Sequence, residues 1–182
     1  MYSSYIAETY LKYNYSIVVF HMSKLPRDFF ARAPEKVAYE LVGRRLVRDY
    51  GDRQASGVVV ETSAFRGIGG RTQNREGIQY EPGRIYVMPF RGKHFLNVTT
   101  EQAAEPTCVW IRELYAVEGV DRKDVNGPAK LTKSLEIGMD MDGQYIDGNE
   151  LWLDGEGVST SKIIEVSGEK ANNCIGIYRL KV

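Results

Sequence analysis

The sequence predicts a mixed α/β fold of the α+β class, in a single domain built on an antiparallel β-sheet with peripheral helices. Three observations support this prediction. The chain has 182 residues, a length that favours one domain with one sizeable core. Most of its apolar segments are short, have a strand-like composition and are separated by turns rich in glycine and aspartate. Helical patterns are few and short, so we expect the helices at the periphery of the sheet.

The individual elements follow from local signals. Pro34 suits the first residue of a helix, and Gly43 ends that helix. Its single apolar face consists of Val37, Ala38, Leu41 and Val42. Strands are predicted at Arg44–Asp49, Gly57–Phe65, Arg84–Met88, Phe95–Thr100 and Thr107–Tyr115. A second helix is expected over Ala129–Leu135, and the glycine-rich residues 66–83 are expected to form a loop.

The domain is expected to occupy residues 22–182. Residues 1–21 lack the basic start and the cleavage site of a signal peptide, and Met22 follows them directly. We therefore expect residues 1–21 to be a leader or an extra N-terminal segment outside the domain.

The overall composition excludes several classes of protein. Hydrophobic residues make up 43% of the chain and charged residues 26%, which are ordinary values for a globular protein. A disordered chain, a collagen and a disulfide scaffold are excluded. No apolar run approaches the roughly 20 residues needed to span a bilayer. We expect a cytoplasmic protein associated with the nucleoid in a prokaryote, or a nuclear protein in a eukaryote, without a membrane partner.

The two cysteines and two histidines do not predict a metal site. Cys108 and Cys174 are far apart, and neither His21 nor His94 stands at metal-ligand spacing from them. We expect two reduced, partly buried thiols. The sequence therefore predicts no metal and no cofactor.

The formal net charge of zero conceals an uneven distribution. Residues 24–93 hold 14 basic and 8 acidic side chains, whereas residues 94–182 hold 9 basic and 15 acidic ones. If these two parts also separate in space, the positive part provides a surface for nucleic acid.

Glu61 is the first candidate for chemistry, because a carboxylate inside an apolar strand needs a partner or a wet cavity. Strict alternation places Val59, Glu61, Ser63 and Phe65 on one face of the strand. Arg112, in the equally apolar segment CVWIRELY, is the expected partner of Glu61. A purely structural ion pair is as good an interpretation as a catalytic one.

Three further segments could contact nucleic acid. Phe90, Arg91 and Lys93 lie on a projecting turn, a combination that suits insertion into a groove, although an ordinary solvated turn is the common alternative. Arg71 and Arg75 lie in the glycine-rich loop, which fits phosphate contacts better than a dinucleotide site. Lys130 follows NGPA at a helix start, where either phosphate binding or simple capping is possible.

Several of these segments, in the same order along the chain, resemble the alkyladenine (3-methyladenine, methylpurine) DNA glycosylase family. The family's opening helix and strand are similar to LPRDFFARAPEKVAYELVGRRLV. Its catalytic strand, usually V-E-T-E-A-Y, is similar to GVVVETSAF, and its base-contacting hairpin to GRIYVMPFRGKHFLNVTTE. The strand with the active-site arginine is similar to VWIRELYAVEG, and the G-P-x-K-L helix to NGPAKLTKSLEI. The match runs from about Leu25 to Leu153, and the segment IGIYRL near the end of the chain is weakly similar to the family as well.

The resemblance implies a monofunctional, metal-free enzyme that acts as a monomer on double-stranded DNA containing damaged purines. Such an enzyme flips the damaged purine out and fills the gap with a hairpin side chain. A carboxylate then activates water to attack C1′ of the deoxyribose while the purine leaves. By position, Arg112 matches the arginine that holds the water, and Asn97 matches the asparagine that discriminates base edges. Arg91, with Phe90 beside it, matches the intercalating residue.

The chain departs from the family pattern in its pocket. Ser63 stands where the family has its general-base glutamate, while Glu61 matches the first glutamate of the motif. Phe65 and Met88 replace two stacking tyrosines, the loop of the pocket histidine is shortened to RGIGGR, and the W-R-F segment is absent. Serine does not take a proton from water unaided. The sequence thus marks a divergent member of the family.

Three hypotheses follow. The first is a repair glycosylase that excises alkylated or otherwise damaged purines by hydrolysing the N-glycosidic bond. The second is a catalytically impaired protein of the same fold that binds damaged DNA, as Ser63 indicates. The third is a related fold that acts on a free nucleoside or nucleotide, which would leave the basic hairpin without a role.

Overall fold

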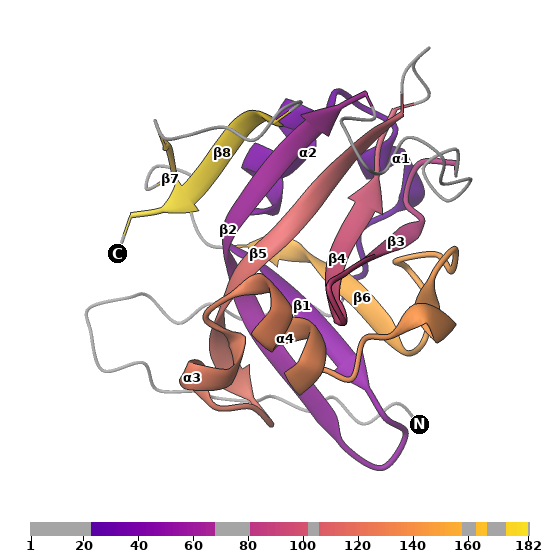
Figure 1. The fold of residues 1–182 in the computed structure, drawn as a ribbon, viewed down its shortest axis with the longest axis vertical. Helices are drawn as coiled ribbons and strands as arrows, with labels where there is room; N and C mark the ends of the chain where they lie inside the picture. The colour runs from indigo at the N-terminus through magenta and orange to yellow at the C-terminus, as the bar shows by residue number, and fades with distance from the viewer. Residues whose placement is uncertain (1–22, 68–80, 102–105, 158–162, 167–173, 182) are drawn as a thin grey trace.

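The fold is described from a computed structural model (Figure 1). The structure describes residues 23–67, 81–101, 106–157, 163–166 and 174–181. Residues 1–21, the expected leader or extra segment, lie outside the described residues. Within the described part, no helix has the length and apolar character needed to cross a membrane.

The described elements are short helices and longer strands. The strands are β1 (Arg44–Asp49), β2 (Gln54–Arg66), β3 (Ile85–Phe90), β4 (Lys93–Thr99), β5 (Thr107–Glu118), β6 (Leu151–Gly157), β7 (Ile163–Glu165) and β8 (Cys174–Leu180). The helices are α1 (Arg27–Phe30), α2 (Pro34–Leu41), α3 (Arg122–Val125) and α4 (Pro128–Ser134), with a 3₁₀ turn η3 (Met139–Met141).

All strands of the described residues join one antiparallel sheet, which confirms the predicted α+β class. Six strands follow the order β3-β4-β5-β2-β1-β6, while β8 pairs with β2 and β7 pairs with β8. The long strand β2 changes partners along one edge. Its residues 54–58 pair with β1, and its residues 61–65 pair with β8. β5 accompanies β2 along its other edge, so the two strands form the centre of the molecule (Figure 1).

Helix α2 forms where its sequence signals predict. Pro34 occupies its first turn, where the missing N–H costs nothing. Its buried residues are Pro34, Val37, Ala38 and Leu41, which turn one face of the helix to the sheet. The chain then leaves the helix through Gly43, whose φ of 89° lies in the left-handed region that glycine adopts without strain.

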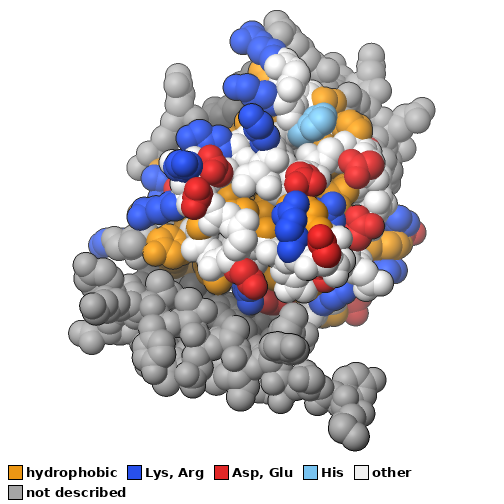
Figure 2. Space-filling view, turned by 90° about the horizontal axis from the view of Figure 1, so that it is seen from below, with side chains coloured by type: hydrophobic (Ala, Val, Ile, Leu, Met, Phe, Trp, Pro, Cys, Tyr) orange, Lys and Arg blue, Asp and Glu red, His pale blue; other side chains and the backbone are white. Residues whose placement is uncertain are grey.

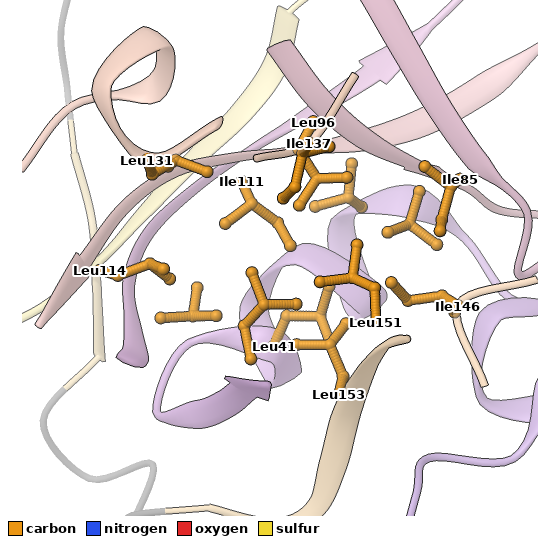
Figure 3. Close-up of a cluster of buried hydrophobic side chains, with 14 of the residues drawn as sticks. Leu41, Ile85, Leu96, Ile111, Leu114, Leu131, Ile137, Ile146, Leu151 and Leu153 are labelled. Carbon is orange, nitrogen blue, oxygen red and sulfur yellow. The ribbon is translucent and has the colours of Figure 1, made fainter. Parts of the chain in front are cut away.

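The core unites residues from helices and strands that are distant in sequence. In Figure 3, Leu41 of α2 and Leu131 of α4 project into the same cluster as Ile111 of β5. Strands β3 and β6 add Ile85 and Leu151, which are also buried. Burying each such side chain contributes about 1.5–3 kcal/mol, so this cluster fixes the position of the sheet relative to its helices.

Strict alternation along β2 places Val59 and Glu61 on one face, and the structure contradicts this prediction. The register of β2 against β5 shifts between Val59 and Glu61 and again between Glu61 and Thr62. These shifts are bulges, each of which inserts one extra residue. Val59 belongs to the core cluster, and the Thr62 hydroxyl donates a hydrogen bond to the Ala38 carbonyl of α2. Glu61 therefore lies on the face of the sheet opposite the core.

Candidate active site

The paired bulges bring two adjacent polar residues of β5 to this same face. Ile111 and Leu114 both belong to the core cluster, although strict alternation would place residues three apart on opposite faces. The two residues between them, Arg112 and Glu113, therefore both lie on the outer face. Glu61 is the cross-strand partner of Glu113. Three charged side chains thus meet at one level of the central strand pair.

Glu61 is buried and is held by two arginines. Its exposed fraction is only 5%. Arg112 Nε lies 3.0 Å from Glu61 Oε1, and the Nε and Nη2 groups of Arg179 both bind Oε2. The expected partnership of Glu61 and Arg112 is present in the structure, and Arg179 of β8 adds a second cation. Both carboxylate oxygens of Glu61 are therefore already paired with guanidinium groups.

Ser63 lies next to this cluster and is fully buried. Arg112 Nη1 donates a hydrogen bond of 3.1 Å to Ser63 Oγ. Arg112 consequently links the two residues of β2 that the sequence singles out. A hydroxyl that already accepts this hydrogen bond from a cation is a poor acceptor for a further proton.

Asn97 and Trp110 continue this row across the sheet, because Asn97 pairs with Trp110 and Trp110 pairs with Ser63. The Asn97 amide nitrogen donates to the carbonyls of Tyr86 and Phe95, at 3.3 and 3.2 Å. Its side chain is 4% exposed. The amide group is thus fixed in orientation by the backbone of β3 and β4.

The two predicted stacking residues, Phe65 and Met88, lie on strands β2 and β3, which two other strands separate. Trp110 and Phe95 fill the space between them. The Phe65 and Trp110 rings are 6.2 Å apart, and the Trp110 and Phe95 rings are 5.2 Å apart. Phe95 is the cross-strand partner of Met88. An aromatic row therefore crosses the sheet beside Ser63.

Trp110 adds a polar group to this row that the sequence analysis missed. Its Nε1 atom is buried and has no hydrogen-bond partner among the described residues, whereas a buried tryptophan N–H usually finds one. The sequence signal was available, because Trp110 and Arg112 alternate with the core residues Val109 and Ile111. The same pattern, a polar residue between apolar ones, marks Arg179, which stands between Tyr178 and Leu180 in a short apolar segment.

The β3–β4 hairpin is longer and its turn tighter than predicted. The sequence indicated a connection over 89–93, but Phe90 pairs with Lys93 and only Arg91 and Gly92 form the turn. Both turn residues have positive φ, 50° and 72°, as in the two-residue turns that match strand twist. Phe90 is 43% exposed, and the Arg91 guanidinium lies 5.1 Å from its ring. An aromatic ring and two cations therefore occupy the exposed tip.

The other predicted DNA contacts are not all assembled at this hairpin. Arg71 and Arg75 lie outside the described residues. Lys130 is in α4, where its ammonium donates to the Lys123 carbonyl and to Asn126 Oδ1, at 3.2 and 2.9 Å. This arrangement ties Lys130 to the α3–α4 connection, although the side chain remains exposed.

The charge halves of the sequence do not separate in space, so the condition for a positive surface made by residues 24–93 is not met. Ion pairs join residues 24–93 to residues 94–182 across the molecule: Arg27–Asp147, Arg45–Glu118, Arg48–Glu150, Arg53–Glu136 and Arg66–Glu101. Figure 2 shows blue and red side chains intermingled across one face. Among the described residues, Arg91 and Lys93 have no carboxylate partner. Positive charge is therefore available locally, at the hairpin tip.

The cysteines are free and buried, as predicted. Burial raises the pKa of the Cys108 thiol to about 12, so this group is neutral at physiological pH. Its Sγ lies 3.8 Å from Asn97 Oδ1. Among the residues that the structure describes, no group of three or more histidine, cysteine, aspartate or glutamate side chains could hold a metal ion.

Comparison with known proteins identifies the family. Residues 28–177 match the family described as "Methylpurine-DNA glycosylase (MPG)". A relative from Carboxydothermus hydrogenoformans is 32% identical over 77% of this chain and 84% of its own, and one from Bacillus subtilis is 31% identical over 80% and 87%. Both bear the name "Putative 3-methyladenine DNA glycosylase". On the family match over most of its length, the chain belongs to the methylpurine-DNA glycosylase family.

Proposed function

We propose that the protein is a DNA glycosylase that removes alkylated purines from double-stranded DNA by hydrolysing the N-glycosidic bond. The observation that carries this proposal is the arrangement of Glu61, Arg112 and Ser63 at one level of the sheet, within a chain of this family. The names of the relatives point to 3-methyladenine as one substrate. We expect a monomer that acts in the cytoplasm, where bacterial DNA is found.

In this proposal, the hairpin tip holds the DNA open. Phe90 and Arg91 enter the duplex and fill the space left by the extruded nucleotide. Lys93 contacts the phosphate backbone of the DNA. Unpaired cations at an exposed turn suit this role, because phosphate contacts supply most of the sequence-independent affinity for DNA.

The extruded base binds on the outer face of the sheet, beside the aromatic row. Phe65, Trp110 and Met88 provide apolar contact surface, and stacking contributes about 1–3 kcal/mol per base. The fixed amide of Asn97 excludes bases that carry a substituent on the edge facing this amide. At the two positions where the family has stacking tyrosines, this pocket has one aromatic side chain, Phe65, and one thioether, Met88, so we expect weaker stacking on the base.

Water then attacks C1′ of the deoxyribose as the purine departs. Alkylation at N3 or N7 makes the purine cationic, and its departure neutralises the ring, so such a leaving group needs little help. Loss of a general base typically costs a factor of 10²–10⁴ in rate. With Ser63 at the usual position of that base, we expect cationic alkylpurines to be excised far faster than neutral hypoxanthine.

A second function is favoured by one specific observation. Because both oxygens of Glu61 are paired with arginines and Ser63 accepts from Arg112, these two residues of β2 offer no free proton acceptor. A protein in this state would bind damaged DNA without excising the base. This alternative predicts that Ser63→Glu, which supplies a carboxylate beside Arg112, creates an activity that the unaltered protein lacks.

An excision assay distinguishes the two functions. The full chain is incubated with duplexes that carry a single 3-methyladenine, 7-methylguanine or hypoxanthine, and the abasic sites are cleaved by alkali. The glycosylase proposal predicts strand cleavage at the alkylated purines and none in an undamaged duplex. Binding of the damaged duplexes by folded protein, without cleavage at any of them, would refute the glycosylase and leave the binding protein.

A further inference from the structure

Efficient attack by water at this site calls for a proton acceptor, which neither predicted residue of β2 provides. Ser63 accepts a hydrogen bond from Arg112, and Glu61 is held on both oxygens by Arg112 and Arg179. A general base must be a free proton acceptor within reach of the water, most often an imidazole or a carboxylate. The outer face of the sheet holds a further carboxylate, that of Glu113.

Glu113 is on that face because of the bulge in β5. Its neighbours Ile111 and Leu114 are both buried in the core, so Glu113 points away from the core together with Arg112. It is the cross-strand partner of Glu61. Side chains that share a face at directly opposite positions have Cβ atoms about 4.5–5.5 Å apart. The Glu113 side chain thus lies beside that of Glu61 on the outer face of the sheet.

The Glu113 carboxylate is also unoccupied. Among the described residues it makes no ion pair and no hydrogen bond, and its side chain is partly exposed. By contrast, Glu118 on the same strand pairs with Arg45. An unpaired, partly exposed carboxylate at the same level of the sheet as Glu61 and Arg112 is available both to water and to a proton.

The charges of this cluster also balance. Glu61 and Glu113 contribute two negative charges, and Arg112 and Arg179 contribute two positive ones. Without Glu113, the site would carry a net positive charge, which opposes both a cationic base and the positive charge that develops on the sugar. With Glu113, the four charges of the cluster sum to zero.

We propose that Glu113 is the general base of this enzyme, in place of the glutamate that Ser63 replaces. The Glu113 carboxylate takes one proton from water as the water oxygen forms a bond to C1′. The C1′–N bond breaks, and its electron pair leaves with the purine, which neutralises a cationic alkylpurine. Glu113 then releases the proton to solvent. This inference rests on the proposed glycosylase function and names the residue that activates the water.

The test compares two isosteric variants in the single-turnover excision of 3-methyladenine by the full chain. Glu113→Gln removes the proton acceptor and should lower the rate by a factor of about 10²–10⁴. Glu118→Gln makes the same change on the same strand, at a side chain that is 54% exposed, and should stay within about twofold of the unaltered rate. Affinity for the damaged duplex and the melting temperature should remain close to those of the unaltered protein in both variants.

A second measurement separates proton transfer from a structural effect. Glu113→Ala opens space at a partly exposed position, where added formate can act as the missing base and should restore part of the rate. Full activity of Glu113→Gln, or failure of formate to restore any activity to folded Glu113→Ala, would overturn the assignment while leaving the glycosylase intact. If the unaltered protein excises no alkylpurine, the proposed function and the assignment both fail.

Discussion

Replacement of Arg179 by methionine tests whether the buried carboxylate of β2 is held as the structure indicates. The change removes one of the two cations that bind Glu61 and keeps a long, flexible side chain on β8. Arg112 remains, but its Nε makes no hydrogen bond of good geometry, so Glu61 would lose its better-bound partner. We expect Arg179→Met to lower the free energy of unfolding.

The expected loss in the free energy of unfolding lies between two limiting cases. Removal of one partner from a fully buried ion pair costs about 3–5 kcal/mol, whereas an exposed pair is worth about 0–1 kcal/mol. Here the Glu61 side chain is 6% exposed and that of Arg179 is 50% exposed. Water can enter where the guanidinium stood, which lowers the cost. We therefore expect a loss of about 2 kcal/mol, since half of the pair is screened by solvent.

Urea unfolding at neutral pH measures this loss, and thermal unfolding checks it. For a chain of this size, 2 kcal/mol lowers the melting temperature by about 4–8 °C. Arg91→Met, at the exposed hairpin tip, makes the same chemical change and should alter stability by less than about 0.5 kcal/mol. A loss for Arg179→Met no larger than that of Arg91→Met would refute the view that Arg179 holds Glu61.

Three further predictions concern other parts of the molecule. Because burial raises the pKa of Cys108 to about 12, iodoacetamide near neutral pH should label Cys108 only after unfolding, as peptide mass spectrometry would reveal. Burial also raises the pKa of Asp154 above 3.8. This contribution favours folding below pH 3.8 and is lost as the pH rises through the folded-state pKa, so Asp154→Asn should gain stability relative to the unaltered protein as the pH rises above 3.8 in urea titrations. In DNA-binding titrations at varied salt, Arg91→Ala and Lys93→Ala should each reduce the salt slope by about 1, whereas Arg53→Ala should not change it.

The fold was predictable wherever local signals decide the structure. Helix α2 begins at Pro34 and ends at Leu41, shortly before Gly43, and strand β1 ends at Asp49, before the turn at Tyr50. Strand β2 begins at Gln54 rather than Gly57, because its first residues are ordered by pairing with β1 and not by their own propensity. The hairpin connection was predicted too long for a similar reason, since Phe90 and Lys93 extend the ladder across the two-residue turn.

The site was predictable only in part. The identity of Glu61, Arg112 and Ser63 followed from an apolar strand and from the family motif, and the structure brings these three together. Their relation to the core did not follow, because a bulge is set by pairing with the neighbouring strand. Arg179 pairs with Glu61 across 118 residues, and no local pattern specifies such a contact.

The paired bulges explain why this one level of the sheet can hold charged chemistry. At a regular level of the β2–β5 pair, each strand gives one side chain to the core and the next to the outer face. At the bulged level, the apolar spacing changes from two residues to three, so both Arg112 and Glu113 lie outside while Ile111 and Leu114 remain buried. This spacing concentrates charge without removing a core side chain, and it occurs where β2 exchanges β1 for β8. The same exchange delivers Arg179, so the point at which the sheet changes partners is also the point at which the candidate active site forms.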